Sequence, residues 1–81
     1  MSSYEETLAA TIEILKKHLD GDRAIVASDH IQNDLGLDSL GIMEVIADVE
    51  DRFDVSVPSD QLAGISTVED VARALDKIRG S

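Results

Sequence analysis

Hydrophobic residues recur at helical spacing near the start of the chain, over residues 4–19. Successive apolar positions lie four, three and four residues apart, and they are Leu8, Ile12, Leu15 and Leu19. This spacing predicts an amphipathic helix that buries these side chains. Its opposite face is charged and comprises Glu13, Lys16 and Lys17. Asp20 and Gly21 predict a turn after the helix, because glycine adopts positive φ without steric cost.

A second amphipathic pattern covers residues 39–53. Its apolar stripe is formed by Ile42, Val45, Ile46, Val49 and Phe53. Asp38 stands just before the pattern, where its carboxylate can accept hydrogen bonds from the free N–H groups of a first helical turn. We therefore predict a helix that begins at Ser39, with Asp38 as its N-cap.

The last part of the chain predicts a short helix and then a longer one. Pro58 disfavours helical backbone at Val57, so "DVSVP" is expected to be extended. A short helix is predicted over residues 59–63, closed by Gly64, and a final helix over residues 67–79. Two pairs fit the reciprocal capping pattern at its start, Ser66 with Glu69 and Thr67 with Asp70. Its core face comprises Val68, Val71, Ala72, Leu75 and Ile78.

Residues 22–38 have no sustained period and form a long connection. Apolar residues are scattered through it, namely Ile25, Val26, Ile31, Leu35 and Leu37. Connections of this length are uncommon unless they pack or serve a function, so we expect this one to pack across the helices. The predicted fold is all-α, a small bundle of three main helices plus one short helix, with this loop between the first two main helices. Residues 1–81 are expected to form a single domain.

The composition restricts the chemistry available to the chain. It has no cysteine, and its only imidazoles are His18 and His30, so disulfides are absent and a zinc site is not expected. The segment "DHIQNDLGLDS" does not match the calcium-loop pattern, which leaves loose divalent binding to acidic surface as the only metal interaction expected. The core rests on aliphatic packing, since Tyr4 and Phe53 are the only aromatic residues.

The formal charge is −10, from seventeen acids and seven bases. This charge argues against binding to nucleic acid or to anionic membranes and favours basic protein partners. An acidic surface that only keeps the protein soluble is the alternative. No apolar run approaches the roughly 20 residues of a membrane span, and "MSSYEETLAA" does not resemble a signal or transit peptide. We expect a cytoplasmic monomer.

Ser39 is the candidate for chemistry, within "GLDSLG" at residues 36–41. The G-x-S-x-G elbow of hydrolases is excluded, because its spacing differs by one residue and no histidine lies in a context for a triad. A serine at this position can also be plain helix surface. Since Asp38 takes the cap role, however, the Ser39 hydroxyl is left free where a helix N-terminus favours a phosphate ester.

A second apolar strip lies on the helix that Ser39 begins, opposite the buried stripe. It consists of Leu40, Met43 and Ala47 and is flanked by Glu44, Asp48 and Asp51. Residues 38–60 contain seven acids and one base, a charge of −6. An exposed apolar strip with an acidic rim is typical of a docking surface for basic partners. The alternative is that the long loop covers Leu40 and Met43.

Taken in order, "LGLDSL", "DRFDVSVP" and "ISTVEDVARAL" make the chain resemble an acyl carrier protein, from the first helix to about Ile78. The resemblance implies that a phosphopantetheinyl transferase joins 4′-phosphopantetheine from coenzyme A to Ser39, beside Asp38. The thiol of that arm then carries acyl groups as thioesters, and the protein has no catalytic residue of its own. It also implies a docking surface of Leu40, Met43, Glu44, Ala47 and Asp48 for acyl-loading and acyl-processing enzymes with basic patches. Val49 and Ile65 are implied to line a cavity for the acyl chain.

The resemblance leaves the cargo and pathway open. Gly41 stands where many fatty-acid carriers have an acid, so polyketide or other specialised biosynthesis is as compatible with the sequence as fatty-acid synthesis. An aminoacyl or peptidyl carrier fits less well, since those resemble "GG-H/D-SL" and are less acidic. The alternative from another class is an unmodified acidic helical adaptor.

Self-repulsion among the acids yields a prediction about stability. Repulsion between surface charges is screened over roughly 8 Å at physiological ionic strength. We expect added sodium chloride or millimolar magnesium to raise the melting temperature gradually, without the saturation of a tight site. Thermal unfolding followed by circular dichroism measures this. A melting temperature independent of salt would contradict the idea that charge limits stability.

Overall fold

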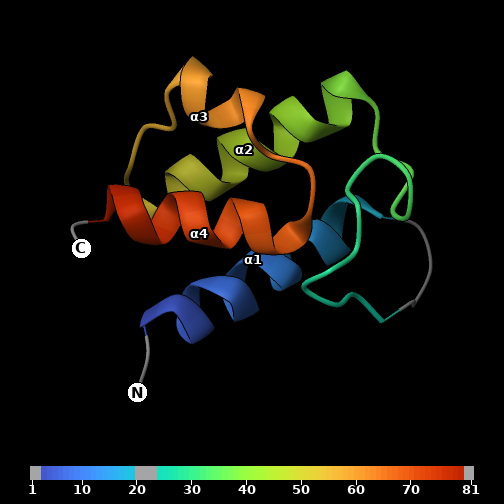
Figure 1. The fold of residues 1–81 in the computed structure, drawn as a ribbon, viewed down its shortest axis with the longest axis horizontal. Coiled ribbons are helices and arrows are strands. Elements are labelled where there is room, and N and C mark those ends of the chain that lie inside the picture. Colours follow the sequence, from blue (N-terminus) through green and yellow to red (C-terminus); the bar gives the residue numbers. More distant parts are fainter. Residues whose placement is uncertain (1–2, 20–23, 80–81) are drawn as a thin grey trace.

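The computed structural model describes residues 3–19 and 24–79. Within them the chain forms four helices, which are α1 (Ser3–His18), α2 (Ser39–Phe53), α3 (Ser59–Ala63) and α4 (Val68–Ile78) (Figure 1). The predicted all-α fold, with a long connection between the first two helices, is confirmed. The only β pairing among the described residues is an isolated antiparallel bridge between His30 and Thr67. The turn predicted at Asp20 and Gly21 lies outside the described residues.

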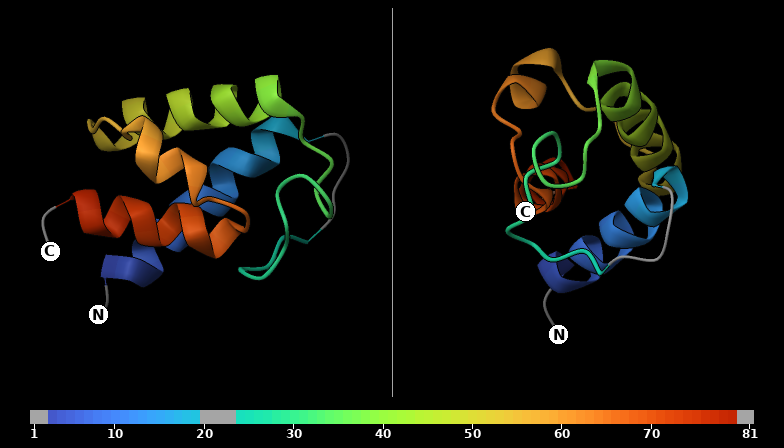
Figure 2. Two further views of the ribbon diagram at one scale, coloured as in Figure 1. Left: turned by 45° about the horizontal axis from the view of Figure 1, so that its top comes forward. Right: turned by 90° about the vertical axis from the view of Figure 1, so that its right-hand side faces the viewer.

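The helix α1 packs on α4 and, less extensively, on α2. The short helix α3 lies on the side of the molecule away from α1, and the long connection runs past the end of α4 where that helix begins (Figure 2). The radius of gyration is 11.6 Å, close to the roughly 12 Å expected for a folded chain of this length. The long connection is therefore packed against the helices and does not extend away from them.

The buried face of α1 differs from the predicted one. Of the four predicted side chains only Leu15 is buried, and Leu8, Ile12 and Leu19 lie partly buried beside the core. The buried residues of α1 are Thr7, Ala10, Thr11, Ile14 and Leu15. The prediction left out Ile14, and two further members of this face are threonines, which a search for apolar residues does not find. Thr11 can be buried because its hydroxyl donates a hydrogen bond to the Thr7 carbonyl, at 2.8 Å.

Arg79 connects the end of α4 to two other helices. Its Nη1 donates a hydrogen bond to Oγ1 of Thr7 in α1, at 3.0 Å. Its guanidinium carbon lies 4.8 Å from the ring centroid of Phe53 in α2, within the range of a cation–π contact. Thr7, which is buried in α1, therefore has a hydrogen-bond partner from the other end of the chain.

The long connection packs as expected, with one exception. Ile25, Ile31 and Leu35 are buried and Leu37 is partly buried, but Val26 is exposed, so the prediction was wrong for that residue. Three backbone hydrogen bonds join the connection to the start of α4: Ile31 N–H to the Ser66 carbonyl at 2.9 Å, Val68 N–H to the Asp29 carbonyl at 3.0 Å, and Glu69 N–H to the Ala27 carbonyl at 2.9 Å. Carbonyls of the loop thus satisfy two of the N–H groups that a helix N-terminus leaves free.

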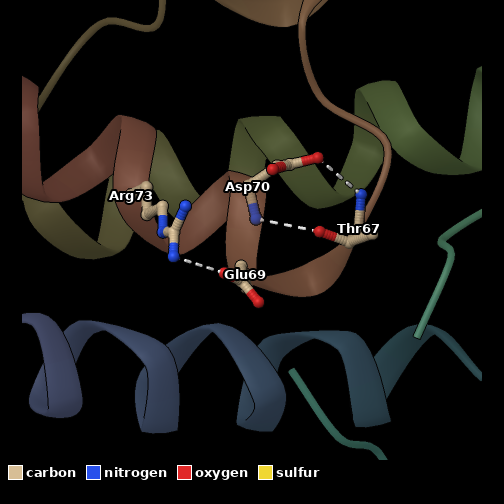
Figure 3. Close-up of polar contacts among 4 residues, drawn as sticks. All are labelled: Thr67, Glu69, Asp70 and Arg73. Carbon is tan, nitrogen blue, oxygen red and sulfur yellow. Dashed lines mark hydrogen bonds and ion pairs between the residues drawn. The ribbon is translucent and has the colours of Figure 1, made fainter. Parts of the chain in front are cut away.

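A capping box begins α4, formed by Thr67 and Asp70 and not by Ser66 and Glu69 (Figure 3). The Asp70 amide donates to Oγ1 of Thr67 at 3.2 Å. The Asp70 carboxylate in turn accepts from the amides of Ser66, at 2.9 Å, and Thr67, at 3.0 Å. These backbone hydrogen bonds, that of Thr67 first, lower the pKa of Asp70 below its ordinary value. Glu69 instead pairs with Arg73 one turn later, at 2.6 Å.

The capping box predicts a pH-dependent contribution to stability. Because folding lowers the pKa of Asp70, its stabilisation is complete above the ordinary pKa of 3.8 and is lost as the pH falls through the lowered value. Asp70→Asn should therefore reduce the free energy of unfolding by about 1 kcal/mol near neutral pH, with a smaller difference from the parent at about pH 2.

Denaturant unfolding of both proteins at the two pH values measures this difference. The control is Asp60→Asn, since Asp60 is an exposed acid in the first turn of α3 and should change stability little. A difference for Asp70→Asn that stays constant with pH would show that the charge of Asp70 does not act through the cap.

Candidate functional site

Ser39 is the first residue of α2, and Asp38 is its N-cap as predicted. The Asp38 carboxylate accepts a hydrogen bond from the Gly41 amide at 2.8 Å, and its carbonyl accepts from the Ile42 amide at 2.9 Å. The Ser39 side chain is exposed, and its hydroxyl has no hydrogen-bond partner within residues 3–19 and 24–79. The cap therefore leaves this hydroxyl accessible from solvent.

The chain reaches Ser39 through a turn at the end of the long connection. Gly36 has a φ of 74°, a left-handed conformation that other residues adopt only with strain. Its amide donates to the Gln32 carbonyl at 3.1 Å, and the following Leu37 amide donates to the Ile31 carbonyl at 3.1 Å. The start of α2 is thereby attached to the same loop that is bonded to α4.

A pocket of about 500 Å³ lies beside Ser39, between α2, α3 and the long connection. Its apolar lining comes from Ile31, Ile42, Met43, Ile46, Leu62 and Ile65. Its polar lining comes from His30, Gln32, Asn33, Ser39 and Ser66. Since Ser39 and most of the other polar residues are exposed, the pocket opens to solvent next to the serine hydroxyl.

Of the two residues expected at a cavity, the structure brings only Ile65 to the pocket. Val49 is 0% exposed and belongs to the core instead. It lies a turn beyond Ile46, on a part of α2 that the pocket does not reach. Sequence reasoning assigned Ile42 and Ile46 to the buried stripe and did not find their second role. Their spacing of four residues shows that they share a helix face, but only the position of α3 makes that face a pocket wall.

His30 lines the same pocket as Ser39, which the sequence did not indicate. No hydrogen bond joins the two side chains in the described part of the molecule, and no carboxylate is bonded to the His30 ring there. The Asp34 carboxylate accepts from the His30 backbone amide, at 2.8 Å. An acid–histidine–serine relay is therefore not formed among these residues.

The second apolar strip of α2 is exposed. Leu40 is 67% exposed and Met43 is 62% exposed, and Ala47 and Glu44 also face solvent. The alternative in which the long loop covers Leu40 and Met43 is therefore wrong. Met43 lines the pocket as well, so the strip and the pocket are continuous at this residue.

Asp48 differs from Glu44 in having a partner. Its Oδ2 lies 2.6 Å from Nε2 of His18 at the end of α1, although 51% of the Asp48 side chain remains exposed. A second pair joins the same two helices, with Arg52 4.0 Å from Glu13. Among the described residues, the acidic rim thus contains carboxylates without a partner at Glu44 and Asp51 and, at Asp48, one that already contacts an imidazole.

Gly41 has little space for a side chain. A Cβ built at this position would lie 3.1 Å from Cδ2 of Leu37 and 3.3 Å from Oδ1 of Asp38. Both distances are tighter than ordinary van der Waals contact, so a larger residue would displace Leu37 or disturb the cap. A side chain at this position would therefore require Leu37 or the Asp38 cap to shift by a few tenths of an ångström.

In the part of the chain that the structure describes, no three histidine, aspartate or glutamate side chains converge closely enough to hold a metal ion. None of the described helices combines the length and the apolar character that crossing a membrane requires.

Comparison with known proteins gives consistent matches. A family model for the phosphopantetheine attachment site matches residues 8–75. The chain is 42% identical over 77 residues to a Caulobacter vibrioides protein named "Probable acyl carrier protein", covering 95% of this chain and 85% of the relative. It is 35% identical over 79 residues to the acyl carrier protein of Prochlorococcus marinus, covering 96% and 99%. The solved structure of "a putative acyl carrier protein" from Mycobacterium tuberculosis has a TM-score of 0.83 at 31% identity, covering 88% of this chain and 96% of that one.

Proposed function

Because the chain belongs to the acyl carrier protein family, whose members carry acyl groups on 4′-phosphopantetheine, we propose that Ser39 is the residue to which this arm is attached. The observation that carries the proposal is the exposed, unbonded hydroxyl of Ser39 at the start of α2, beside the pocket. When bound, the arm supplies a terminal thiol that holds the acyl group as a thioester. Members of this family act as carriers for other enzymes and not as catalysts.

The surroundings of Ser39 suit a phosphate ester. The backbone amides of Ser39 and Leu40 have no partner among the described residues, while the Gly41 amide is bonded to Asp38. Free N–H groups at the N-terminus of a helix, together with the helix dipole, favour a negatively charged group. A phosphate on Ser39 would lie where these groups can donate to it.

Ser39 needs no activating base of its own in this function. We propose that a phosphopantetheinyl transferase catalyses the transfer from coenzyme A, and that no residue of this chain is catalytic. An unmodified acidic adaptor would have the same exposed serine, so attachment of the arm is the decisive test.

We predict that incubation with coenzyme A and a phosphopantetheinyl transferase adds one arm to the parent protein and none to Ser39→Ala. Intact-mass spectrometry measures the addition. The helical circular dichroism of Ser39→Ala should equal that of the parent, because the hydroxyl makes no hydrogen bond among the described residues. Ser59→Ala, at the start of α3, is the control and should accept the arm normally. An arm on Ser39→Ala would overturn the assignment of Ser39.

The exposed strip of α2 supports docking of the partner enzymes. Leu40, Met43 and Ala47 provide apolar contact, and Glu44 and Asp48 provide negative charge beside it. We propose that basic patches of the transferase and of acyl-loading and acyl-processing enzymes bind here. Because Asp48 contacts His18, Glu44 is more available to a partner than Asp48.

The two components of this surface should affect binding differently. Glu44→Lys should slow association with the transferase, and the effect should fade as salt rises, since exposed charges act mainly by steering. Met43→Ala should instead speed dissociation by about fivefold to thirtyfold, the equivalent of about 1 to 2 kcal/mol, with little salt dependence. Stopped-flow binding at two salt concentrations separates the two effects.

The control for charge is Glu5→Lys, which makes the same change at an exposed position of α1. Neither Met43→Ala nor Glu44→Lys should lower the melting temperature, because both side chains are exposed. Equal effects of Glu44→Lys and Glu5→Lys on association would show that only net charge matters and that the strip is not the docking surface.

A further inference from the structure

The pocket beside Ser39 has two chemically different walls. One wall is aliphatic and is formed by Ile42 and Ile46 of α2, Leu62 of α3 and Ile65 in the turn that follows α3. The long connection contributes buried Ile31 and the exposed polar side chains of His30, Gln32 and Asn33, which form the polar wall. A plain alkyl chain would form no hydrogen bonds with the polar wall.

The polar wall is held in a defined position by the backbone. The Ile31 amide donates to the Ser66 carbonyl at 2.9 Å, and the amides of Asp34 and Leu35 donate to the His30 carbonyl at 2.9 and 3.0 Å. These bonds use main-chain groups only. The side-chain amides of Gln32 and Asn33 have no hydrogen-bond partner within the described residues. Each retains a carbonyl acceptor and two N–H donors for a ligand.

The two walls differ in how contact with a bound acyl chain changes the free energy. Methylene groups gain free energy by leaving water against the aliphatic wall. Against the polar wall they would remove water from amide groups without replacing its hydrogen bonds, which is unfavourable. A hydroxyl or keto group on the chain would supply the missing partner.

We propose that this pocket selects acyl chains that carry hydroxyl or keto oxygens over plain alkyl chains of the same length, with Gln32 and Asn33 as the specificity-determining side chains. The proposal rests on the attachment of the arm at Ser39. The phosphopantetheine arm has amide groups of its own, which offer the same hydrogen-bonding chemistry. Its contribution has to be separated from that of the cargo.

The experiment compares the protein carrying the free arm with the protein carrying octanoyl, 3-hydroxyoctanoyl or 5-hydroxyoctanoyl thioesters. Each is prepared with the transferase and the matching coenzyme A derivative, and intact mass confirms the loading. The cleavage rate of each thioester by hydroxylamine is divided by that of the same acyl group on free pantetheine, which removes differences in intrinsic reactivity. Nuclear magnetic resonance of the Gln32 and Asn33 side-chain amides reports contact directly.

We expect at least one hydroxylated chain to be protected about threefold to tenfold more than octanoyl, the range given by one net hydrogen bond. The double variant Gln32→Leu, Asn33→Leu should abolish this preference. The matched control is Gln61→Leu. Gln61 is the only other glutamine in the sequence and does not line the pocket, so this variant should preserve the preference. The side-chain amide signals of Gln32 and Asn33 should shift with the hydroxylated cargo and not with octanoyl.

Equal protection of plain and hydroxylated chains on a correctly loaded protein would overturn the proposal and leave the carrier function intact. Amide shifts that are already complete with the free arm and do not change with cargo would also overturn it, since the polar wall would then bind the arm. Failure of the arm to load on Ser39, seen in the mass spectrum, would instead refute the attachment site, and this inference with it. The comparison of chains on the parent protein does not depend on the folding of any variant.

Discussion

Hydrogen bonds between the long connection and the N-terminus of α4 are the constraint on which the rest of the site depends. The amides of Val68 and Glu69, which have no acceptor within α4, donate to carbonyls of the connection, and the Ile31 amide donates to the Ser66 carbonyl. The capping box of Thr67 and Asp70 satisfies the remaining groups at this point. A helix end buried against a loop without such partners would be costly. The junction therefore fixes the path of a segment that has no regular structure of its own.

Two functional features follow from this fixed path. The Leu37 amide bonds to the Ile31 carbonyl, so the approach to Ser39 is attached to the segment that the junction holds. The same segment contributes the polar wall of the pocket, and α2 and α3 contribute most of its aliphatic lining. The position of the serine and the chemistry of the pocket beside it thus both depend on the junction between the long connection and the start of α4.

The acidic surface and the apolar core act at different ranges. The core is aliphatic and its residues come from all three main helices and the connection, so its stability depends on close packing. The negative charge acts over longer distances and weakens with salt, and in the docking that we propose it steers basic partners toward α2. The contact of His18 with Asp48 reduces the number of free carboxylates on that helix. Met43, which is uncharged, belongs to both the exposed strip and the pocket.

The sequence by itself determined the local features of this protein. Helical periodicity located the three main helices, and the cap residue Asp38 identified the start of α2, because both depend on interactions within a few residues. Pro58 and Gly64 indicated the limits of the short helix α3. The buried stripes of α2 and α4 also followed from periodicity, but only the tertiary structure decided which face of α1 is buried and which residues line the pocket. It placed Thr7 and Thr11 in the core, moved Val49 away from the pocket and gave Ile42 and Ile46 to its wall. These outcomes depend on where other helices and the loop lie, and periodicity along one helix does not contain that information.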